Sequence, residues 1–310
     1  GGEDSYFESL VKLLRDKGHV VITYTKDSKK INTISNKIKT GIGMFWNMDT
    51  EKELTYIIKK NKPDVTHFHN LYPIISPTAY WVCRKYNIPI IQHIHNYRFM
   101  CPKGTLFRRG TICELCVARK LPFYSVIFGC YHQSRLASLF FSLSFFFHQL
   151  IQTFRLVDRF IFPSEFTRNY YLKNLKIAKE KTALIPHFIE GINIEKEKQK
   201  FTEKNYFLFV GRLSEEKGII PLLDLFKDLP TKNLVVIGDG PLKNQVDLYK
   251  KYENIEIKGF LPRNKTLMYV KNANCIIIPS LWYEVLPFVY LEAYIYKILV
   301  LLVCRELFFA

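Results

Sequence analysis

Along the chain, short runs of β-branched and aromatic residues alternate with longer segments whose apolar positions recur at helical spacing. In the first 190 residues this pattern predicts strands and helices in turn. The predicted strands are 19–24, 64–70, one within 88–97 that runs into a loop, 157–162 and 183–188. The predicted helices are 6–17, one ending at 61, 79–86, 136–151 and 165–175.

The same order returns after residues 191–205, a polar segment rich in Lys and Glu that we interpret as an interdomain linker. Strand–helix–strand repeats with short turns are typical of doubly wound α/β folds. We therefore predict two Rossmann-like domains, residues 1–190 and 206–310. In the second domain the predicted strands are 206–210, 234–237, 255–261 and 274–279, and the predicted helices begin near 219, 264 and 288.

Gly1 and Gly2 stand directly before the first predicted helix. A Gly-Gly loop at this place suits close approach of the backbone to a phosphate. In a doubly wound domain a strand feeds such a loop, so we expect that the sequence lacks its first strand and is truncated at the N-terminus.

The composition changes this picture in one respect, the charge. Hydrophobic content of 48% and charged content of 24% are those of a globular protein, but 45 Lys and Arg against 28 Asp and Glu give a net charge of +17. Such a surface attracts nucleic acid, anionic lipid headgroups or phosphorylated substrates. The longest apolar run, 136–147, is too short to span a bilayer, which favours a cytoplasmic protein and leaves peripheral membrane attachment open.

Two carboxylates lie at the end of the last predicted strand of the second domain. Glu284 falls in the strand-to-helix loop, and Glu292 lies more than one turn into the helix that Pro287 opens. Ligands bind at the carboxyl ends of strands in open α/β sheets, and carboxylates there accept hydrogen bonds from hydroxyl groups, as on sugars. The alternative is two solvated carboxylates around an ordinary helix start.

The second domain opens with a buried strand, a glycine turn and two cations, Arg212 and Lys217. A guanidinium forks onto phosphate oxygens while an ammonium adds a point charge, so the pair suits a diphosphate. The alternative is an ordinary solvated surface loop.

Histidines follow two predicted strands of the first domain. His67 and His69 end one strand and His93 and His95 end the next, so all four are expected at the carboxyl edge of one sheet. Packing alone would explain them, but a functional role is favoured for His95 because it lies at the strand exit.

Residues 101–130 form an insertion that contains four cysteines, Cys101, Cys113, Cys116 and Cys130. The spacing of Cys113 and Cys116 is that of a metal knuckle, and the other two complete a tetrahedral thiolate site. Structural zinc is our prediction, with disulfides or free thiols as alternatives. Cys275 and Cys304 lie in apolar runs and are predicted core residues.

The predicted helix 136–151 contains five phenylalanines. Burial in the core is the common fate of such residues, whereas a position in the headgroup region of a membrane is the alternative.

Several motifs together resemble family 4 retaining glycosyltransferases of the GT-B fold. They are the Gly1-Gly2-Glu3 loop, the turn at 18–21, residues 211–218, 238–241, and the Glu-x7-Glu signature from Glu284 to Glu292. The segment 95–97 and the cysteine insertion resemble a bacterial subgroup of surface-polysaccharide assembly. The resemblance implies two doubly wound domains facing across a cleft. It also implies a Pro-Val strand and a glycine-rich loop near the C-terminal end, and both are missing from 297–310. We therefore expect truncation at this end as well, and an unstable fragment.

The resemblance also implies roles for particular residues. His95 and Glu284 would be catalytic, with His95 near the reaction centre on the acceptor side and Glu284 at the donor sugar. The donor would be bound by Gly2, Arg212, Lys217, Glu284, Leu286 and Glu292, with Glu292 at the ribose hydroxyls of the nucleotide. No Asp-x-Asp triplet occurs, so no cofactor is expected for catalysis, and the two cations would replace a metal beside the diphosphate.

The implied function is transfer of a hexose from a nucleotide-diphosphate sugar to a lipid-linked or polysaccharide acceptor of the cell envelope, with retention, at the inner face of the membrane. Alternatives are a nucleotide-sugar epimerase or phosphorylase of the same fold, a basic zinc-containing nucleic-acid-binding protein, and an inactive fragment. No nucleic-acid partner is expected, because no recognition-helix or base-stacking motif occurs.

Overall fold

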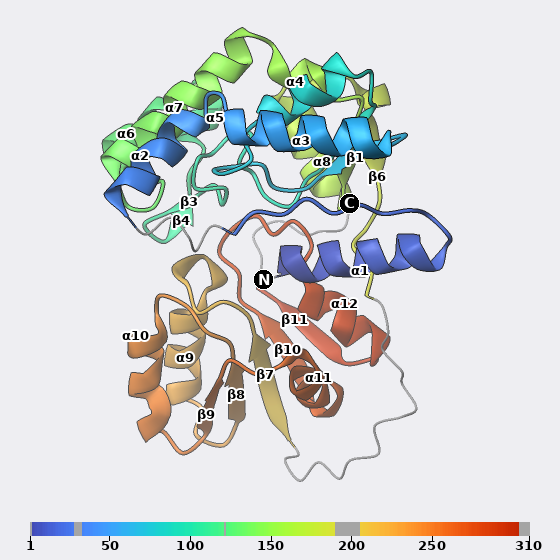
Figure 1. Cartoon of the computed structure of the whole chain (residues 1–310). Coiled ribbons are helices and arrows are strands. Elements are labelled where there is room, and N and C mark those ends of the chain that lie inside the picture. The colour runs from blue at the N-terminus through green and yellow to red at the C-terminus, as the bar shows by residue number, and fades with distance from the viewer. Residues whose placement is uncertain (1, 28–32, 121, 190–204, 304–310) are drawn as a thin grey trace. The chain divides into compact units, whose positions relative to one another are not determined.

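The computed structural model describes residues 2–27, 33–120, 122–189 and 205–303, which cluster into two compact units (Figure 1). The N-terminal unit comprises residues 10–106 and 113–186. The C-terminal unit comprises 187–189 and 205–303 together with 2–9 and 107–112. Of the predicted linker, all but Asn205 lies outside the described residues.

The N-terminal unit is built on a four-stranded sheet in the order β1-β2-β5-β6. Every neighbouring pair is parallel, so all strands end at the same edge. The strands are β1 (Thr66–Phe68), β2 (Ile90–His93), β5 (Arg159–Phe162) and β6 (Thr182–Leu184). Each lies within a predicted strand or overlaps it.

Helices connect these strands. In chain order they are α1 (Gly2–Asp16), α2 (Ile34–Gly43), α3 (Met48–Asn61), α4 (Thr78–Lys85), α5 (Leu115–Ala118), α6 (Phe123–Phe128), α7 (Arg135–Leu150) and α8 (Glu165–Asn174). Short 3-10 turns lie at η2 (Thr153–Leu156) and η3 (Lys179–Lys181), and a small hairpin is formed by β3 (Phe107–Arg108) and β4 (Thr111–Ile112). Side-chain caps define several starts: Asn47, Ser134 and Ser164 each accept a backbone N–H at the start of α3, α7 and α8.

The C-terminal unit contains a five-stranded parallel sheet in the order β11-β10-β7-β8-β9. The chain builds outward from the central strand through β8 and β9, then returns to the other side of β7. Its elements are β7 (Tyr206–Val210), η4 (Glu215–Lys217), α9 (Ile219–Lys227), β8 (Asn233–Ile237), α10 (Lys243–Asp247), η5 (Leu248–Lys251), β9 (Ile255–Gly259), α11 (Arg263–Asn272), β10 (Cys275–Ile278), α12 (Phe288–Ile295) and β11 (Leu299–Leu302). This is the doubly wound order that the sequence predicts.

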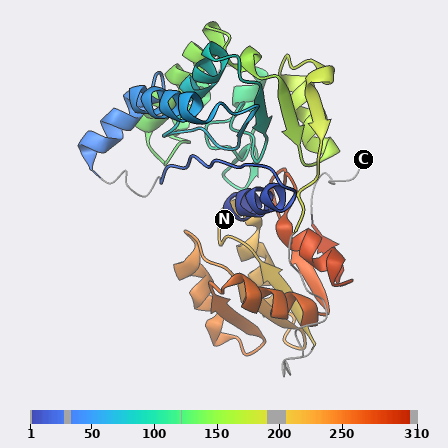
Figure 2. The same cartoon turned by 45° about the vertical axis from the view of Figure 1, so that its right-hand side comes forward.

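Helices cover both faces of the C-terminal sheet (Figure 1 and Figure 2), and one layer of core side chains lies on each face. Successive strand residues point to opposite faces, so Phe209 packs under α9 whereas Leu208 packs under α11 and α12. Cys275 is buried in β10, as predicted, and Cys304 lies outside the described residues.

Two predictions about the first 24 residues are wrong. The first helix begins at Gly2 rather than at Tyr6, so Gly2 opens a helix instead of sitting in a loop; Gly1 lies outside the described residues. Residues 19–24 form no strand in the described structure, and Val20 is 93% exposed. An apolar β-branched run becomes a strand only where a neighbouring strand supplies backbone partners.

Residues 297–310 lack the expected Pro-Val sequence, but within the described residues a strand of different sequence forms there. β11 pairs in parallel with β10 over four residues, from Cys275 opposite Leu299 to Ile278 opposite Leu302. A β-branched and leucine-rich run is sufficient for a strand when an unpaired edge lies beside it. The remainder of that segment, from Cys304, lies outside the described residues.

Among the described residues, none of the helices combines the length and the apolar character needed to cross a membrane.

Candidate functional site

The strand order of the C-terminal sheet contains a topological switch point between β7 and β10. β7 and β10 are neighbours, and the chain leaves them toward opposite sides of the sheet. In doubly wound sheets this switch point, at the carboxyl ends of the two strands, is where ligands bind. The loop after β7 carries Arg212 and Lys217, and the loop after β10 carries Glu284. The tertiary structure therefore brings together residues that are 67 positions apart.

Glycines let these loops approach one another closely. Gly218 has φ +67°, and a Cβ atom there would lie 1.9 Å from the carbonyl oxygen of Pro279. The backbone N–H of Leu281 donates to the carbonyl of Glu216 at 2.9 Å, which joins the two loops directly. Any side chain at position 218 would force the loops apart.

Glu284 is the buried centre of the site. Its side chain is 4% exposed and its Oε1 lies 2.5 Å from Lys217 Nζ. The hydroxyl of Ser280 donates to the same oxygen at 2.5 Å. Both contacts use Oε1, which leaves Oε2 as the oxygen available to a ligand hydroxyl.

Lys217 is held on a second side by an aromatic ring. Its Nζ lies 5.1 Å from the centroid of Trp282, within the range of a cation–π contact. Trp282 and Ser280 were missed by the sequence reasoning. Both residues lie shortly before Glu284 in the loop after β10, and this closeness in sequence could have identified them as candidates.

Glu292 lies on α12, buried to 6% exposure, and pairs with Arg263 of α11 at 3.1 Å. Burial raises the pKa of the Glu292 carboxyl, and the charge of Arg263 opposes this rise. Arg263 was also missed, because it lies 29 residues earlier in an unrelated stretch of sequence.

The other predicted donor-binding residues are placed differently. Arg212 is exposed, and within the described structure its guanidinium makes no recorded hydrogen bond or ion pair. Leu286 is half-buried, and its carbonyl accepts a hydrogen bond from His187 Nδ1 at 3.3 Å. Burial lowers the pKa of His187 to about 4, with the bond to Leu286 opposing.

Gly2 lies against the first residue of α12. A Cβ atom at Gly2 would be 2.9 Å from a ring carbon of Phe288, which in turn stacks on His187 with 5.0 Å between ring centroids. Tyr6, one turn later in α1, packs on the same two rings. The N-terminal residues thus pack at the start of α12, the helix that carries Glu292.

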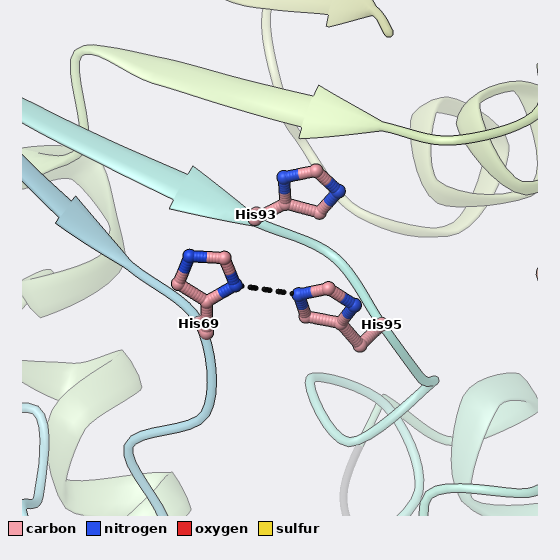
Figure 3. Close-up of side chains that lie close together, drawn as sticks. All are labelled: His69, His93 and His95. Carbon is pink, nitrogen blue, oxygen red and sulfur yellow. Dashed lines mark hydrogen bonds between the residues drawn. The ribbon is translucent and has the colours of Figure 1, made fainter. Parts of the chain in front are cut away.

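In the N-terminal unit, four histidines form a stacked group at the carboxyl edge of the sheet, as predicted. His69 stacks with His67 on one side and His93 on another, and His95 stacks with both His69 and His93. His95 Nε2 lies 2.8 Å from His69 Nδ1 (Figure 3). Burial lowers the pKa of His67 to about 4.

Gln92 holds the backbone around this group in place. It is fully buried in β2, accepts a hydrogen bond from the Tyr80 hydroxyl, and donates from Nε2 to the carbonyls of His69 at 2.6 Å and His93 at 2.7 Å. Both strand ends are therefore tied to one side chain. His95 also lines a cavity with His69, Asn70, Tyr72, His93 and Arg98.

The four insertion cysteines gather in the N-terminal unit. Burial, together with the neighbouring thiols of Cys101, Cys130 and Cys113, raises the pKa of the Cys116 thiol to about 12. Within the described residues none of the four forms a disulfide. They are not among the sets of three or more potential ligands that converge within 4.8 Å in the described part of the chain. Zinc at this site stays a prediction.

Comparison with known proteins places the whole fold. The family model described as Glycosyltransferase Family 4 matches residues 1–190, and the model described as Glycosyl transferases group 1 matches 192–305. A curated uncharacterised glycosyltransferase of Methanocaldococcus jannaschii is 27% identical over 155 residues, covering 45% of this chain and 38% of its own. Alpha-monoglucosyldiacylglycerol synthase of Streptococcus pneumoniae is 25% identical over 304 residues, covering 86% of this chain and 60% of its own. The chain thus spans less than two thirds of these two relatives.

Solved structures with similar folds include sucrose-phosphate synthase from Thermosynechococcus elongatus, with a TM-score of 0.60 at 15% identity over 97% of this chain and 75% of that one. Anabaena HepE in complex with UDP-glucose has a TM-score of 0.54 at 13% identity, covering 95% of this chain and 70% of its own. These similarities confirm the predicted GT-B fold with two Rossmann-like domains. With a family model matching more than half of its length, the chain belongs to glycosyltransferase family 4.

Proposed function

We propose that this protein transfers a sugar from a nucleotide-diphosphate sugar to a glycan or lipid-linked acceptor, with retention of the anomeric configuration as the family resemblance implies. The observation that carries the proposal is the pairing of Lys217 with buried Glu284 at the switch point of the C-terminal sheet. A cation and a hydroxyl acceptor side by side suit a phosphate linked to a sugar.

The donor diphosphate is assigned to the two cations. Arg212 is exposed and ready to fork onto phosphate oxygens, while Lys217 is already placed between Glu284 and Trp282. Placed cations offset the charge that develops on the leaving nucleotide without reorganisation during the reaction. Relatives of the same fold were solved with UDP and with UDP-glucose, which supports this class of donor.

Carboxylates are assigned to the hydroxyl groups of the donor. Glu284 accepts a hydrogen bond from a sugar hydroxyl through Oε2, and Glu292 accepts one from a ribose hydroxyl. A buried carboxylate gives up a hydrogen-bonded partner at low cost only when the ligand supplies a donor in an equally good position. Leu286 and Gly2 line the same end of α12 through His187 and Phe288. On the acceptor side the role belongs to His95.

The acceptor side also includes an apolar surface on α7. Its outward stripe is formed by residues three or four positions apart: Leu136, Leu139, Leu143, Phe146 and Leu150, all at least 38% exposed. The inward face carries Phe141 and Phe145, which are buried in a hydrophobic core cluster, beside the buried Ser138, Ser142 and His148. This helix therefore exposes an apolar stripe in addition to the apolar residues that it buries, unlike an ordinary surface helix, whose outer face is polar.

A membrane surface is the partner that we assign to this stripe. α2 packs beside α7, with Gly41 against the ring of Phe140, and adds exposed Ile38 and Ile42 next to exposed Lys37. Apolar residues beside basic ones suit the interface of an anionic leaflet, and the cytoplasmic leaflet carries that charge. The Streptococcus relative is named for a diacylglycerol product, which is consistent with a lipid-linked acceptor.

The direct test is a screen of nucleotide-sugars for thermal stabilisation of the protein, followed by radiolabelled transfer with the best donor. A donor at 100 times its dissociation constant should stabilise the fold by about 2.7 kcal/mol. Sugar transferred only when an acceptor is present supports the proposal. Turnover of the donor without an acceptor would favour an epimerase, and stabilisation by none of the nucleotides would refute the donor site.

A further inference from the structure

Three histidines of the N-terminal unit bring their rings close together. One nitrogen each from His69, His93 and His95 lies within 4.8 Å of the other two (Figure 3). Within the described residues, these three histidines are the group of His, Cys, Asp or Glu side chains that lies close enough together to hold a metal ion. The cluster belongs to the N-terminal unit, whereas the switch point belongs to the C-terminal unit.

The fold explains why these side chains converge. β1 and β2 are parallel neighbours with Phe68 opposite Gln92, so the residues that follow them leave the sheet side by side. Gln92 then fixes the carbonyls of His69 and His93 with one amide group. His95 lies two residues beyond His93 and returns to the same side.

The distances suit a metal ion. Zn²⁺ binds imidazole nitrogen at about 2.0–2.1 Å, which puts two nitrogens of a tetrahedral site about 3.3 Å apart. The observed separations run from 2.8 Å, between His69 Nδ1 and His95 Nε2, to the upper limit of 4.8 Å. The three rings stack with 8–19° between their planes, so binding requires them to turn about their side-chain bonds until one nitrogen of each faces the ion.

We propose that His69, His93 and His95 bind one divalent transition-metal ion of the zinc, copper or nickel class. Neutral imidazole is a preferred ligand of these ions, and three protein ligands leave a fourth position open to water. Arg98 lines the same cavity, and its charge opposes a bound cation. The site is therefore weaker than a closed four-ligand structural site.

Metal binding has a consequence for the proposed transferase reaction. A metal on His95 occupies the imidazole that the proposed function places near the reaction centre. Binding of the ion and contact between His95 and substrate then exclude one another, so the ion inhibits transfer. This consequence rests on the proposed function, whereas the binding site itself does not.

The test is a titration of the purified chain with Co²⁺ as a spectroscopic probe, with displacement by Zn²⁺. Wild-type protein should bind one equivalent that gives visible ligand-field bands without a sulfur-to-cobalt charge-transfer band. His69→Asn and His93→Asn should each lose this equivalent. Any ion held by the insertion cysteines is recognised by its charge-transfer band and by its loss in Cys116→Ser.

His67→Asn is the matched control, because His67 stacks on His69 and His93 but lies outside the converging set. This variant should still bind one equivalent of Co²⁺. The comparison therefore distinguishes loss of a metal-binding histidine from disturbance of the stacked rings. Circular dichroism shows whether each variant is folded. If either His69→Asn or His93→Asn does not fold, the test rests on the other variant. A wild-type chain that gives only thiolate bands or binds no Co²⁺ overturns the proposal, as does an unchanged equivalent in a folded ligand variant.

Discussion

The ion pair between Lys217 and Glu284 preorganises the proposed donor site. Glu284 is almost fully buried, and a buried carboxylate without a charged partner is strongly destabilising. Lys217 therefore stabilises the fold and awaits the diphosphate with the same ammonium group. Structural and functional roles of this residue can be separated by removing the two charges together.

We expect Lys217→Met to lower the free energy of unfolding by up to about 3 kcal/mol, since it leaves Glu284 with a hydroxyl as its partner. The double variant Lys217→Met with Glu284→Gln should recover most of this stability but should still fail to bind or use the donor. Urea denaturation and donor titration measure the two effects. Lys250→Met, which removes a surface charge paired with Asp247, is the control and should change neither. Donor binding restored in the double variant would contradict the proposed role.

A buried histidine makes stability depend on pH. His148 is fully buried, with Nδ1 3.0 Å from the Thr153 hydroxyl and Nε2 3.1 Å from the Met44 carbonyl. Burial lowers its pKa to about 4, and its bonds to the carbonyls of Met44 and Phe45 oppose this. The Met44 carbonyl accepts from Nε2–H, so Nδ1 accepts from the hydroxyl of Thr153 in the neutral form.

The sign of the pH effect follows from the lowered pKa. The unfolded chain binds a proton at this histidine near pH 6.5 and the folded chain only near pH 4, so stability is full above pH 6.5 and falls as the pH drops from 6.5 to 4. The loss due to His148 is at most about 3 kcal/mol. Denaturant titrations over this range should show a shallower fall for His148→Asn than for wild type. The exposed His19→Asn should behave as wild type. Equal slopes in all three would show that His148 is not the group responsible.

At the scale of elements, the loops after β7 and β10 depend on a glycine contact. Gly218 and Gly259 have nearly the same left-handed backbone, with φ of +67° and +69°, but a Cβ atom meets the Pro279 carbonyl at the first and nothing within 4 Å at the second. Alanine substitutions at these two positions therefore distinguish the cost of the left-handed backbone from the cost of a steric clash between the new Cβ atom and the Pro279 carbonyl.

We expect Gly259→Ala to cost about 1 kcal/mol from the left-handed conformation alone. Gly218→Ala should cost clearly more and should also weaken donor binding, because the loops that carry Lys217 and Glu284 must move apart. Thermal denaturation and donor titration of both variants measure the difference. Equal effects of the two substitutions would show that the close approach does not matter.

The exposed stripe of α7 makes a prediction for membranes. Replacing Leu136, Leu143 and Leu150 by Gln should reduce binding to anionic vesicles at least tenfold, since each leucine contributes about 1.5–3 kcal/mol when fully buried. Leu248→Gln, at a leucine that is 68% exposed in the C-terminal unit, is the control and should leave binding unchanged. Flotation with phosphatidylserine vesicles gives the readout. Unchanged flotation of the triple variant would contradict the membrane assignment and leave the stripe to another partner.

At the scale of the whole chain, a net charge of +17 adds a field to these local contacts. Such a field attracts anionic partners over distances set by the ionic strength, about 8–10 Å at 0.1–0.15 M salt. Both proposed partners, the diphosphate donor and the anionic leaflet, carry the opposite sign. Vesicle binding should therefore weaken as salt is raised, while the apolar contribution of α7 remains.

The order of strands and helices in the second domain could be predicted from the sequence because local patterns report which residues can be buried. The runs at 206–210, 234–237 and 274–279 became β7, β8 and β10. Loops after such strands meet at one sheet edge in any doubly wound fold, so the region that holds Arg212, Lys217 and Glu284 could be predicted as well.

Other features depend on partners that local sequence does not name. Residues 19–24 have the composition of a strand but pair with no strand among the described residues, whereas β11 forms because β10 offers an edge. For the five phenylalanines of α7 the sequence left burial and membrane contact open, and the structure divides them: Phe141 and Phe145 are buried in the core, whereas Phe146 lies in the exposed stripe.

The sequence by itself therefore determined the fold class, the family motifs and the loops in which the chemistry lies, because periodicity and glycine or proline turns act over a few residues. Only the tertiary structure decided which side chains meet. Lys217 reaches Glu284, Arg263 reaches Glu292, and three histidines from two strands converge. These contacts depend on strand order and register, which arise when distant segments pack together.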